Sequence, residues 1–367
     1  MYIIVGAGIS GCVIARELAE RGEKIQVVES RDHIGGNCYD YVDSETGIRI
    51  NKYGAHLFHT NDEGVWNYIN KHGKWERWDH QVISRVDGKF VPVPVNITTV
   101  NRLCGVNISN EAEMNDWLAS VQHDYEEPKN SEEMALSRVG QVLYDKMFKP
   151  YTVKQWNKDP SELAPSVMAR IPVRNNFDER YFSDKYQALP AHGYTKWFEN
   201  LLDHPNIQVY LDTSFESLEP ITVSAATGII YTGPIDEYFK KSHGSLEYRS
   251  IDFKIEKLFD KGYYQPNSVV NYPSTDVSFT RIVEYKHFLH QTSPHTIIVS
   301  ETTNDTGPPY YPVPNERNMK LYDQYKAMAE KEELEKNVYF VGRLANYKYF
   351  NMDQAVRNAL DFVSKIR

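Results

Sequence analysis

The sequence has few cysteines, no long uninterrupted apolar run and no excess of positive charge. Its three cysteines, Cys12, Cys38 and Cys104, are too few for a disulfide framework in 367 residues, and they lack the paired spacing of a zinc site. The most apolar long window, residues 2–19, contains glycine, serine and Arg16, which favours a buried strand, turn and helix over a membrane span. A net charge of −9 disfavours binding to nucleic acid. We therefore expect a cytoplasmic protein without a metal site or membrane span, in which local arginines hold any anionic ligand.

What the sequence has in excess is aromatic side chains. Aromatic residues make up 13% of the chain, including 26 tyrosines, whereas the hydrophobic fraction of 41% is ordinary for a globular enzyme. Packing explains most of them, but tyrosine-rich clefts also suit sugars and nucleobases. The length predicts two or three domains.

A glycine-rich turn follows the first predicted strand. Residues 2–5 form an apolar run typical of a buried strand, and Gly6, Gly8 and Gly11 follow in the spacing G-x-G-x-x-G before a predicted helix. Glu29 ends the next predicted strand, where its carboxylate can accept hydrogen bonds from a ribose. The alternative is a tight packing turn without a ligand. The complete strand–helix–strand context favours a dinucleotide site, with the pyrophosphate at the helix N-terminus.

Two further segments distinguish between the possible dinucleotides. Gly35 and Gly36 follow Glu29 closely, where the backbone can approach the same phosphates. Near the C-terminus a predicted strand runs into Gly342 and Arg343, and a last helix follows. In flavoproteins with two dinucleotide folds, such a late segment approaches the flavin end of FAD, whereas an NAD dehydrogenase has no need of it. We therefore expect FAD rather than NAD.

The remaining pattern predicts a helical region and an antiparallel sheet. Residues 82–95 alternate around an Asp-Gly pair, which indicates a hairpin, and two prolines place its second strand at a sheet edge. Residues 114–147 carry apolar side chains at helical spacing, and Pro150 is expected to end this stretch. Short successive strands are expected over 246–300.

The predicted fold class is α/β, with a Rossmann-like FAD-binding domain, a helical insertion domain and a mixed antiparallel β-sheet domain. The FAD-binding domain should alternate strands and helices, whereas the substrate should lie against the sheet domain. The expected ranges are 1–80, 193–245 and 317–367 for the FAD-binding domain, 97–148 for the helical domain, and 82–95, 151–192 and 246–316 for the sheet domain.

Ten short blocks along the chain occur together in one family order. They are HIGGN (33–37), KYGAHLFHT (52–60), YTVKQW (151–156), RIPVR (170–174), YTGPID (231–236), LEYR (246–249), NY (271–272), TRIVEYK (280–286), YYPV (310–313) and GRLANYKY (342–349). The sequence thereby resembles the prokaryotic-type UDP-galactopyranose mutases. The resemblance implies an FAD-dependent isomerase, often a homodimer, that interconverts UDP-galactopyranose and UDP-galactofuranose without net redox change.

A ring contraction at the anomeric carbon needs a leaving group, a nucleophile and an anchor. UDP is a stable leaving anion, and the sequence has no clear carboxylate pair of the glycosidase kind. The resemblance implies that N5 of reduced flavin attacks C1 as UDP departs, and that the sugar recloses through O4 before UDP returns. The protein then supplies orientation and charge stabilisation.

Arginines are the expected anchors for the diphosphate, because a guanidinium can bind two phosphate oxygens at once. By resemblance, Arg281 and Arg249 grip the phosphates, and Arg170 lies near the flavin and sugar, so that Arg281 and Arg170 are the expected catalytic residues. Arg174 is expected to be structural. For any single arginine, the alternative is a surface ion pair.

The resemblance also assigns smaller roles around both ligands. The other expected substrate contacts are Tyr151, Thr152, Trp156, Tyr181, Asn271, Tyr311, Tyr349 and His59. The expected cofactor contacts, besides Gly6, Gly8, Gly11, Glu29, Gly36, Gly342 and Arg343, are Ser10, Ser30, Arg31, Asn37, His56, Leu57, Met352, Val356 and Arg357.

Two positions depart from the family pattern. Asn351 stands where many members have Asp, and His80 stands where a small amide is expected near the uridine. They leave open a related nucleotide sugar, N-acetylated or deoxy, as the substrate. Two other functions compete, an amine-oxidase-type FAD oxidoreductase and a flavin-binding protein that has lost catalysis.

Overall fold

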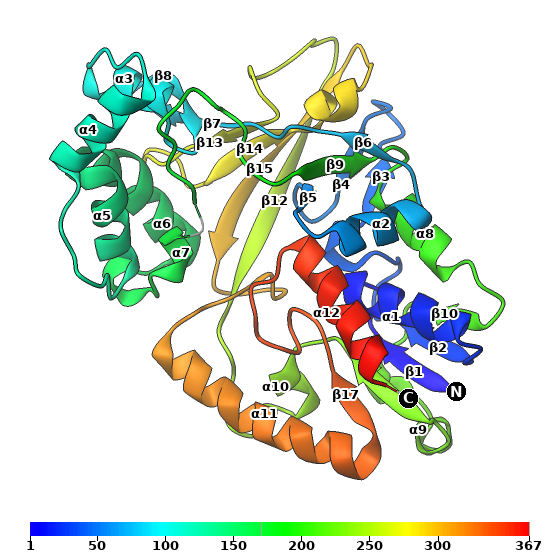
Figure 1. Ribbon diagram of the computed structural model, residues 1–367. Coiled ribbons are helices and arrows are strands. Elements are labelled where there is room, and N and C mark those ends of the chain that lie inside the picture. The colour runs from blue at the N-terminus through cyan, green and yellow to red at the C-terminus, as the bar shows by residue number, and fades with distance from the viewer. Residues whose placement is uncertain (170, 367) are drawn as a thin grey trace.

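A parallel sheet of five strands joins both ends of the chain (Figure 1). The computed structural model describes residues 1–169 and 171–366. The strand order in the sheet is β10–β2–β1–β11–β17, as a Rossmann-like domain requires. The strands are β1 (Tyr2–Val5), β2 (Ile25–Val28), β10 (Ile207–Tyr210), β11 (Gly228–Tyr231) and β17 (Val338–Phe340), and most of their predicted positions are confirmed.

Helices cover both faces of this sheet. On one face α1 packs against α8 and α12 in the largest hydrophobic core, and α2 packs on α12. On the other face Ile3 and Ile229 pack against α9 and α10, and α11 crosses below them (Figure 1). The helices are α1 (Ile9–Glu20), α2 (Glu63–Lys71), α8 (Tyr194–Leu202), α9 (Pro220–Ser224), α10 (Ile235–Tyr238), α11 (Glu316–Lys336) and α12 (Met352–Lys365), with the 3-10 turn η4 (Phe215–Ser217).

A small antiparallel sheet and a hairpin extend the nucleotide-binding part. The sheet has the order β5–β9–β6, and the hairpin pairs β3 with β4. We had expected residues 151–192 to belong to the large sheet, but β9 pairs here instead, with Phe58 opposite Ala188. The elements are η1 (Gly36–Cys38), β3 (Asp40–Val42), β4 (Arg49–Asn51), β5 (Phe58–Thr60), β6 (Trp75–Arg77) and β9 (Tyr186–Pro190).

A mixed sheet of seven strands has the order β16–β12–β15–β14–β13–β7–β8. The predicted hairpin is confirmed as β7–β8, and β8 is an edge strand. The prediction of only short strands was wrong, because β12 and β15 have 11 and 9 residues. Polar residues such as Asp252 and Lys254 lie along one partly solvated strand instead of breaking it. The elements are β7 (Val82–Val86), β8 (Lys89–Val93), β12 (Tyr248–Leu258), β13 (Val269–Asn271), β14 (Arg281–Glu284), η5 (Tyr285–His290), β15 (Thr296–Asn304) and β16 (Tyr311–Pro312).

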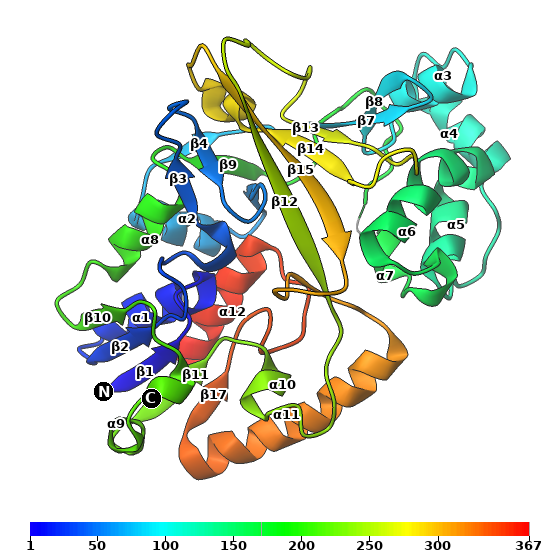
Figure 2. The same ribbon diagram turned by 180° about the vertical axis from the view of Figure 1, so that it is seen from behind.

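A helical region packs beside the far end of this sheet. Figure 2 shows the long β12–β15 pair between it and the nucleotide-binding part. Pro150 was predicted to end the helices, but it lies in the first turn of α6, where a missing N–H is tolerated. The chain therefore remains helical to Trp156. The elements are α3 (Ile97–Cys104), α4 (Glu111–Val121), α5 (Ser131–Leu143), the π-helical turn η2 (Tyr144–Phe148), α6 (Lys149–Trp156), η3 (Pro160–Glu162) and α7 (Ser166–Ala169).

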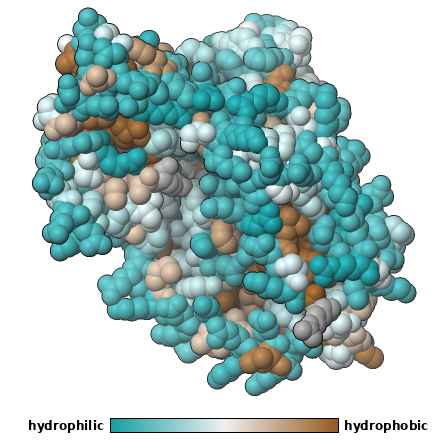
Figure 3. All heavy atoms as spheres, in the orientation of Figure 1, coloured by the Kyte–Doolittle hydropathy of each residue, from teal (hydrophilic) through white to brown (hydrophobic). Residues whose placement is uncertain are grey.

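The outer surface is largely hydrophilic on the face drawn in Figure 3, where hydrophobic residues form small separate patches. Among the residues that the structure describes, no helix has both the length and the apolar character needed to cross a membrane. The apolar N-terminal segment that could have suggested a span is the buried β1–α1 unit.

Candidate functional site

The turn between β1 and α1 is packed too tightly for side chains at several glycines. A Cβ atom on Gly11 would lie 1.9 Å from the carbonyl oxygen of Gly6, and one on Gly6 would lie 2.3 Å from Thr232 Oγ1. A Cβ atom on Gly36 would lie 3.0 Å from the Cα atom of Gly8, so the two glycine loops touch. No side chain caps the N-terminus of α1 at Gly8, which leaves its N–H groups open to an anion.

Glu29 lies at the end of β2 beside this turn. One carboxylate oxygen accepts the Ala7 N–H at 2.8 Å, and the other accepts the Arg31 N–H at 3.0 Å and the Ser30 hydroxyl at 3.3 Å. The side chain is buried, and these contacts fix its position. An ionised carboxylate has about four acceptor positions, so Glu29 keeps the capacity to accept a ribose hydroxyl.

Two half-buried arginines near the turn have buried N–H groups without a partner. Within the described part of the chain, Nε and Nη2 of Arg343 and Nη1 of Arg31 have no hydrogen-bond partner. Arg31 lies 4.5 Å from the Tyr53 ring centre and donates to Asn37 Oδ1 at 2.9 Å. Arg343 lies 4.5 Å from the ring centre of Tyr349. Buried cationic donors without partners are unfavourable, so these groups indicate an anionic ligand.

The C-terminal segment returns to the glycine turn, as predicted. A Cβ atom on Gly342 would lie 2.8 Å from Ser10 Oγ, and the Gly342 N–H points to Asn346 and Asn358, each at 3.2 Å. Residues from the first and the last parts of the chain therefore form one wall of the nucleotide site.

Further along α12 the predicted cofactor residues are engaged elsewhere. Arg357 forms a two-contact ion pair with Asp62, at 2.8 Å for each contact, which fastens α12 to the start of α2. Val356 is buried in the core, and Met352 packs at its edge. Their contact with a cofactor remains a prediction.

Arg281 lies at the centre of the second part of the site. It begins β14 and faces Glu301 on β15, where Nε donates to Oε2 at 2.6 Å. Burial opposes the guanidinium charge, but Glu301 together with Tyr311 and Tyr151 raises the pKa of Arg281 above its ordinary value. Glu301 is buried, and its Oε1 has no partner among the described residues. The sequence analysis missed Glu301, although a single acid in the apolar run of residues 296–301 was a signal.

Aromatic side chains surround Arg281. The Tyr311 and Tyr349 rings stack at 5.3 Å with an interplanar angle of 11°, and both pack beside the buried Trp156 of α6. Burial raises the pKa of Tyr151, and the neighbouring Arg281 opposes that shift. Burial and Tyr349 together raise the pKa of Tyr311 to about 12. The structure thus brings five predicted substrate residues together from four separate parts of the chain.

The histidines near this centre are held neutral or fixed by neighbours. Burial, helped by Arg343 and Arg281, lowers the pKa of His56 to about 4, and burial beside Arg281 lowers that of His80 to about 3. Trp78 Nε1 donates to His80 Nδ1 at 3.3 Å, which requires the proton of the neutral ring to be on Nε2. His59 stacks on a phenylalanine and lies 2.9 Å from Asp184.

Arg249 and Arg174 are held by protein groups. Nε of Arg249 donates to the Gln155 carbonyl at 3.0 Å, and Nη1 forms an ion pair with Asp305. Its contact with phosphate therefore remains a prediction. Arg174 donates to backbone carbonyls, those of Asp178 and Phe182 among them, which confirms a structural role.

The remaining predicted residues occupy varied positions. Asn271 lies opposite Arg281 on β13, Thr152 is buried in α6, and Tyr181 packs beside His80. Asn351 caps the start of α12. Leu57 packs at the edge of the largest core. Arg170 lies outside the described residues.

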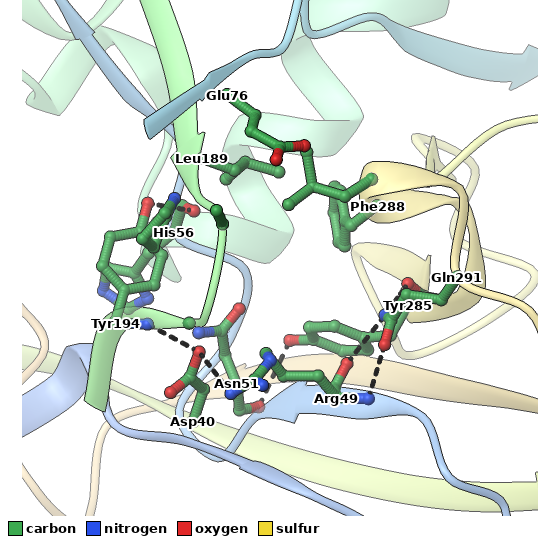
Figure 4. Close-up of a pocket in the computed structure, with 14 residues that line it drawn as sticks. Asp40, Arg49, Asn51, His56, Glu76, Leu189, Tyr194, Tyr285, Phe288 and Gln291 are labelled. Carbon is green, nitrogen blue, oxygen red and sulfur yellow. Dashed lines mark hydrogen bonds and ion pairs between the residues drawn. The ribbon is translucent and has the colours of Figure 1, made fainter. Parts of the chain in front are cut away.

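A cavity of about 300 Å³ lies on another side of His56 (Figure 4). In the figure, His56 and Tyr194 form one side and Arg49 and Tyr285 the other, and Glu76 points in from above. Asp40 in its wall is already bonded to the first N–H groups of α8. Of the predicted site residues that the structure describes, His56 is the one that lines this cavity.

The fold and the site together define a dinucleotide-binding protein with a second, arginine- and tyrosine-lined region. A model of NAD(P)-binding Rossmann-like domains matches residues 4–71, and a UDP-galactopyranose mutase model matches residues 146–349. A Klebsiella pneumoniae protein described as "Probable UDP-galactopyranose mutase" is 40% identical, with 99% of this chain and 95% of the relative covered. The chain belongs to the UDP-galactopyranose mutase family. These matches imply a flavin cofactor.

Two further similarities bear on substrate and fold. A dTDP-fucopyranose mutase from Escherichia coli is 37% identical, with 98% of this chain and 96% of the relative covered. A crystal structure of reduced UDP-galactopyranose mutase superposes with a TM-score of 0.77 at 17% identity, with 99% of this chain and 94% of that chain covered. The second likeness supports the fold, including the Rossmann-like part.

Proposed function

We propose that this protein is an FAD-dependent mutase that interconverts UDP-galactopyranose and UDP-galactofuranose without net redox change. The observation that carries the proposal is the arrangement around Arg281 and Arg343. The Arg343 guanidinium, on the side of the glycine turn, lies over both rings of the stacked pair Tyr311 and Tyr349. Arg281, on the sheet, lies close enough to Tyr311 to interact with it electrostatically. A phosphate-bearing cofactor and a phosphate-bearing substrate would meet at this boundary.

The residues of the nucleotide site fit FAD. The touching glycine loops and the uncapped α1 N-terminus would receive the pyrophosphate, and Glu29 would receive the ribose. The unpartnered N–H groups of Arg31 and Arg343 are donors for its anionic and carbonyl oxygens. When bound in its reduced form, FAD supplies a nucleophile for the anomeric carbon at N5.

The protein groups would orient the sugar nucleotide and stabilise the leaving diphosphate. Glu301 holds Nε of Arg281, so the terminal nitrogens are presented in one orientation to the phosphate oxygens. Because negative charge grows on the departing phosphate, Arg281 stabilises the transition state more than the bound substrate. Tyr311, Tyr349 and Trp156 offer flat surfaces to the sugar and the base.

A second candidate substrate is a deoxyhexose linked to a thymidine nucleotide. The Escherichia coli relative named dTDP-fucopyranose mutase covers nearly the whole chain, and His80 here lies close enough to Arg281 to interact with it electrostatically. A fixed Nε2–H donor at this position differs from the small amide expected of the galactose enzymes. The two candidates share the reaction and differ only in the nucleotide sugar.

The experiment that tests the proposal compares the oxidised and reduced holoenzyme. Purified protein should be yellow from bound FAD, and dithionite-reduced protein should convert UDP-galactofuranose into UDP-galactopyranose, as followed by chromatography. The oxidised protein should be inactive, and the reductant should not be consumed in proportion to product. Equal turnover in both states would exclude the mechanism. Flavin reduction by substrate would favour an oxidoreductase instead, and faster turnover of dTDP-fucofuranose would select the second candidate.

A further inference from the structure

Lys154, within the YTVKQW block on α6, places its ammonium group among backbone carbonyls of a loop in the large sheet. Nζ donates to the carbonyls of Ser274 at 2.7 Å, Phe279 at 2.9 Å and Val277 at 3.2 Å, and it also contacts the carbonyl of Tyr272. These four carbonyls belong to one loop, residues 272–279, between β13 and β14. The ammonium group thus holds the carbonyl groups of this loop together around Nζ.

The backbone of the same part of α6 is bonded to the large sheet. The Lys154 carbonyl accepts the Thr303 hydroxyl of β15, and the Gln155 carbonyl accepts Nε of Arg249 from β12. Asn157, directly after the helix, contacts Asp305. The C-terminal half of α6 is therefore fixed to two strands, whereas the Lys154 side chain fixes it to the loop that leads into β14.

The two segments that Lys154 joins carry opposite sides of the candidate substrate site. On α6, Tyr151 lies three residues before Lys154 and Trp156 two residues after it. On the other segment, Arg281 comes two residues after Phe279, the last carbonyl in the loop. A change in the distance between α6 and the loop would therefore move the aromatic side chains relative to the phosphate anchor.

We propose that Lys154 is a positioning residue for nucleotide-sugar binding, which sets the spacing between Tyr151 and Trp156 on α6 and Arg281 on β14 through its cage of loop carbonyls. The role of these three residues rests on the proposed function. Lys154 itself acts through the helix and the loop, because its three N–H groups are already directed to the carbonyls.

Charge makes this contact stronger than an ordinary helix-to-loop hydrogen bond. A cationic donor to carbonyl oxygens forms charge-assisted bonds. Burial lowers the pKa of Lys154 to about 8 and Asp276 in the same loop opposes that shift, so the ammonium form still prevails at pH 7. Removal of the ammonium group would leave several partly buried carbonyls without a donor. The loop would then relax, and with it the start of β14.

The test uses Lys154→Ala and Lys154→Gln in the reduced holoenzyme, with Lys149→Met as the matched control. Lys149 begins the same helix, and its ammonium lies 5.9 Å from the Tyr144 ring centre. The Lys154→Ala variant should raise KM for UDP-galactofuranose about 10- to 100-fold and lower kcat by a smaller factor, since displaced groups bind the substrate less well and a displaced Arg281 stabilises the departing phosphate less. The control should match wild type in both constants.

Chemical rescue distinguishes positioning from a general loss of structure. Propylammonium can enter the space left in Lys154→Ala and donate to the same carbonyls, whereas tetramethylammonium has the charge but no N–H group. Propylammonium should restore KM to within about fivefold of wild type at saturation, and tetramethylammonium should not. Equal rescue by both cations, a KM that stays at the wild-type value, or a loss confined to kcat would each overturn the proposal.

Two further measurements test the role of Lys154 separately from folding and from the proposed function. Flavin content shows whether a variant has folded, and UDP affinity can be measured without mutase activity. If Lys154→Ala retains no flavin, Lys154→Gln carries the test, because its amide can satisfy two of the carbonyls. UDP affinity of the oxidised holoenzyme should fall in parallel with the rise in KM. If wild type has no mutase activity but UDP affinity still depends on Lys154 and on propylammonium, the proposed function fails and the positioning role stands.

Discussion

The nucleotide-binding region and the substrate region of this protein are built in different ways. The first is formed largely by backbone, since Gly8 and Gly36 touch and Glu29 is held by main-chain N–H groups. The second is formed by side chains from α6, β14, β15, β16 and the segment before α12, held by ion pairs such as Arg281 with Glu301. In the first region the close backbone packing leaves little room for a larger side chain at each glycine. In the second region the geometry of the site depends on the distances between separate segments of the chain.

The largest expected effect tests the backbone-built region. Gly11→Ala should lower the free energy of unfolding by at least about 4 kcal/mol, because its Cβ would overlap a backbone carbonyl that cannot move without shifting β1. Urea denaturation with fluorescence measures the change. The structure gives a Cβ-to-oxygen distance of 1.9 Å, so a variant as stable as wild type would contradict this packing.

Gly8→Ala is the matched control for that change. Its Cβ would meet the Gly36 Cα atom at 3.8 Å, which is ordinary contact, so the protein should fold normally. Flavin content should nevertheless fall, because the added methyl group stands where we expect the pyrophosphate to pass. A Gly8→Ala protein that is fully loaded with flavin would show that the cofactor takes another path.

The next effect tests the side-chain-built region. Arg281→Ala should weaken UDP binding by about 2–4 kcal/mol, since a guanidinium that binds two phosphate oxygens is lost. Turnover should fall further, and Arg281→Lys should recover only part of either loss. Calorimetry measures UDP affinity, and chromatography measures turnover.

A second substitution, at Glu301, shows whether lower UDP affinity in Arg281→Ala comes from the lost phosphate contact or from lower stability. Arg281→Ala alone leaves the Glu301 carboxylate buried without its partner, which lowers stability. Adding Glu301→Gln should recover stability without recovering UDP affinity. Wild-type UDP affinity in the single variant would show that Arg281 is not the anchor.

The first region could be predicted from sequence, and the second only in part, for the same physical reason. The βαβ unit and the last strand and helix are encoded in local periodicity and turn residues, and the structure contains each of them. Arg281 and the aromatic residues were found through the family blocks. Glu301 was missed because its role comes from register, as it faces Arg281 across two strands separated by a 3-10 segment.

Two misplaced elements show the same limit. The helical stretch was expected to end at Pro150, whereas α6 continues it to Trp156. This continuation becomes visible only when the contacts of α6 with β12 and β15 are known. Similarly, β9 was assigned to the large sheet because nothing local distinguishes it from a strand that pairs with β14. Pairing partners more than a hundred residues apart leave no local pattern.

The smallest expected effect is a dependence of stability on pH in the nucleotide-binding region. Burial, with Arg16 and Lys71 nearby, lowers the pKa of His72 at the end of α2 to about 4, from about 6.5 in the unfolded chain. Between these values the unfolded state binds more protons, so stability falls as the pH falls through this window and is unaffected above it. From pH 7 to pH 5 this histidine should contribute a loss of about 1–2 kcal/mol.

His72→Gln should remove that part of the acid sensitivity, whereas His123→Gln, at an exposed position in the helical region, should not. Urea denaturation at both pH values gives the comparison. The same acid loss in all three proteins would show that other groups account for it. UDP affinity should be unchanged in both variants, because neither histidine is near Arg281.

The position of β17 in the sheet has a consequence for how the protein is made. β1 is synthesised before the other strands of its sheet, yet the sheet is completed only when residues 338–340 join β11 and α12 covers α1. Until then a nascent chain exposes one apolar side of α1, while the helical region, whose contacts are mostly local, is free to fold. Because Gly342 and Arg343 follow β17 directly, the predicted cofactor contacts are complete only after residues 342–343 have been synthesised.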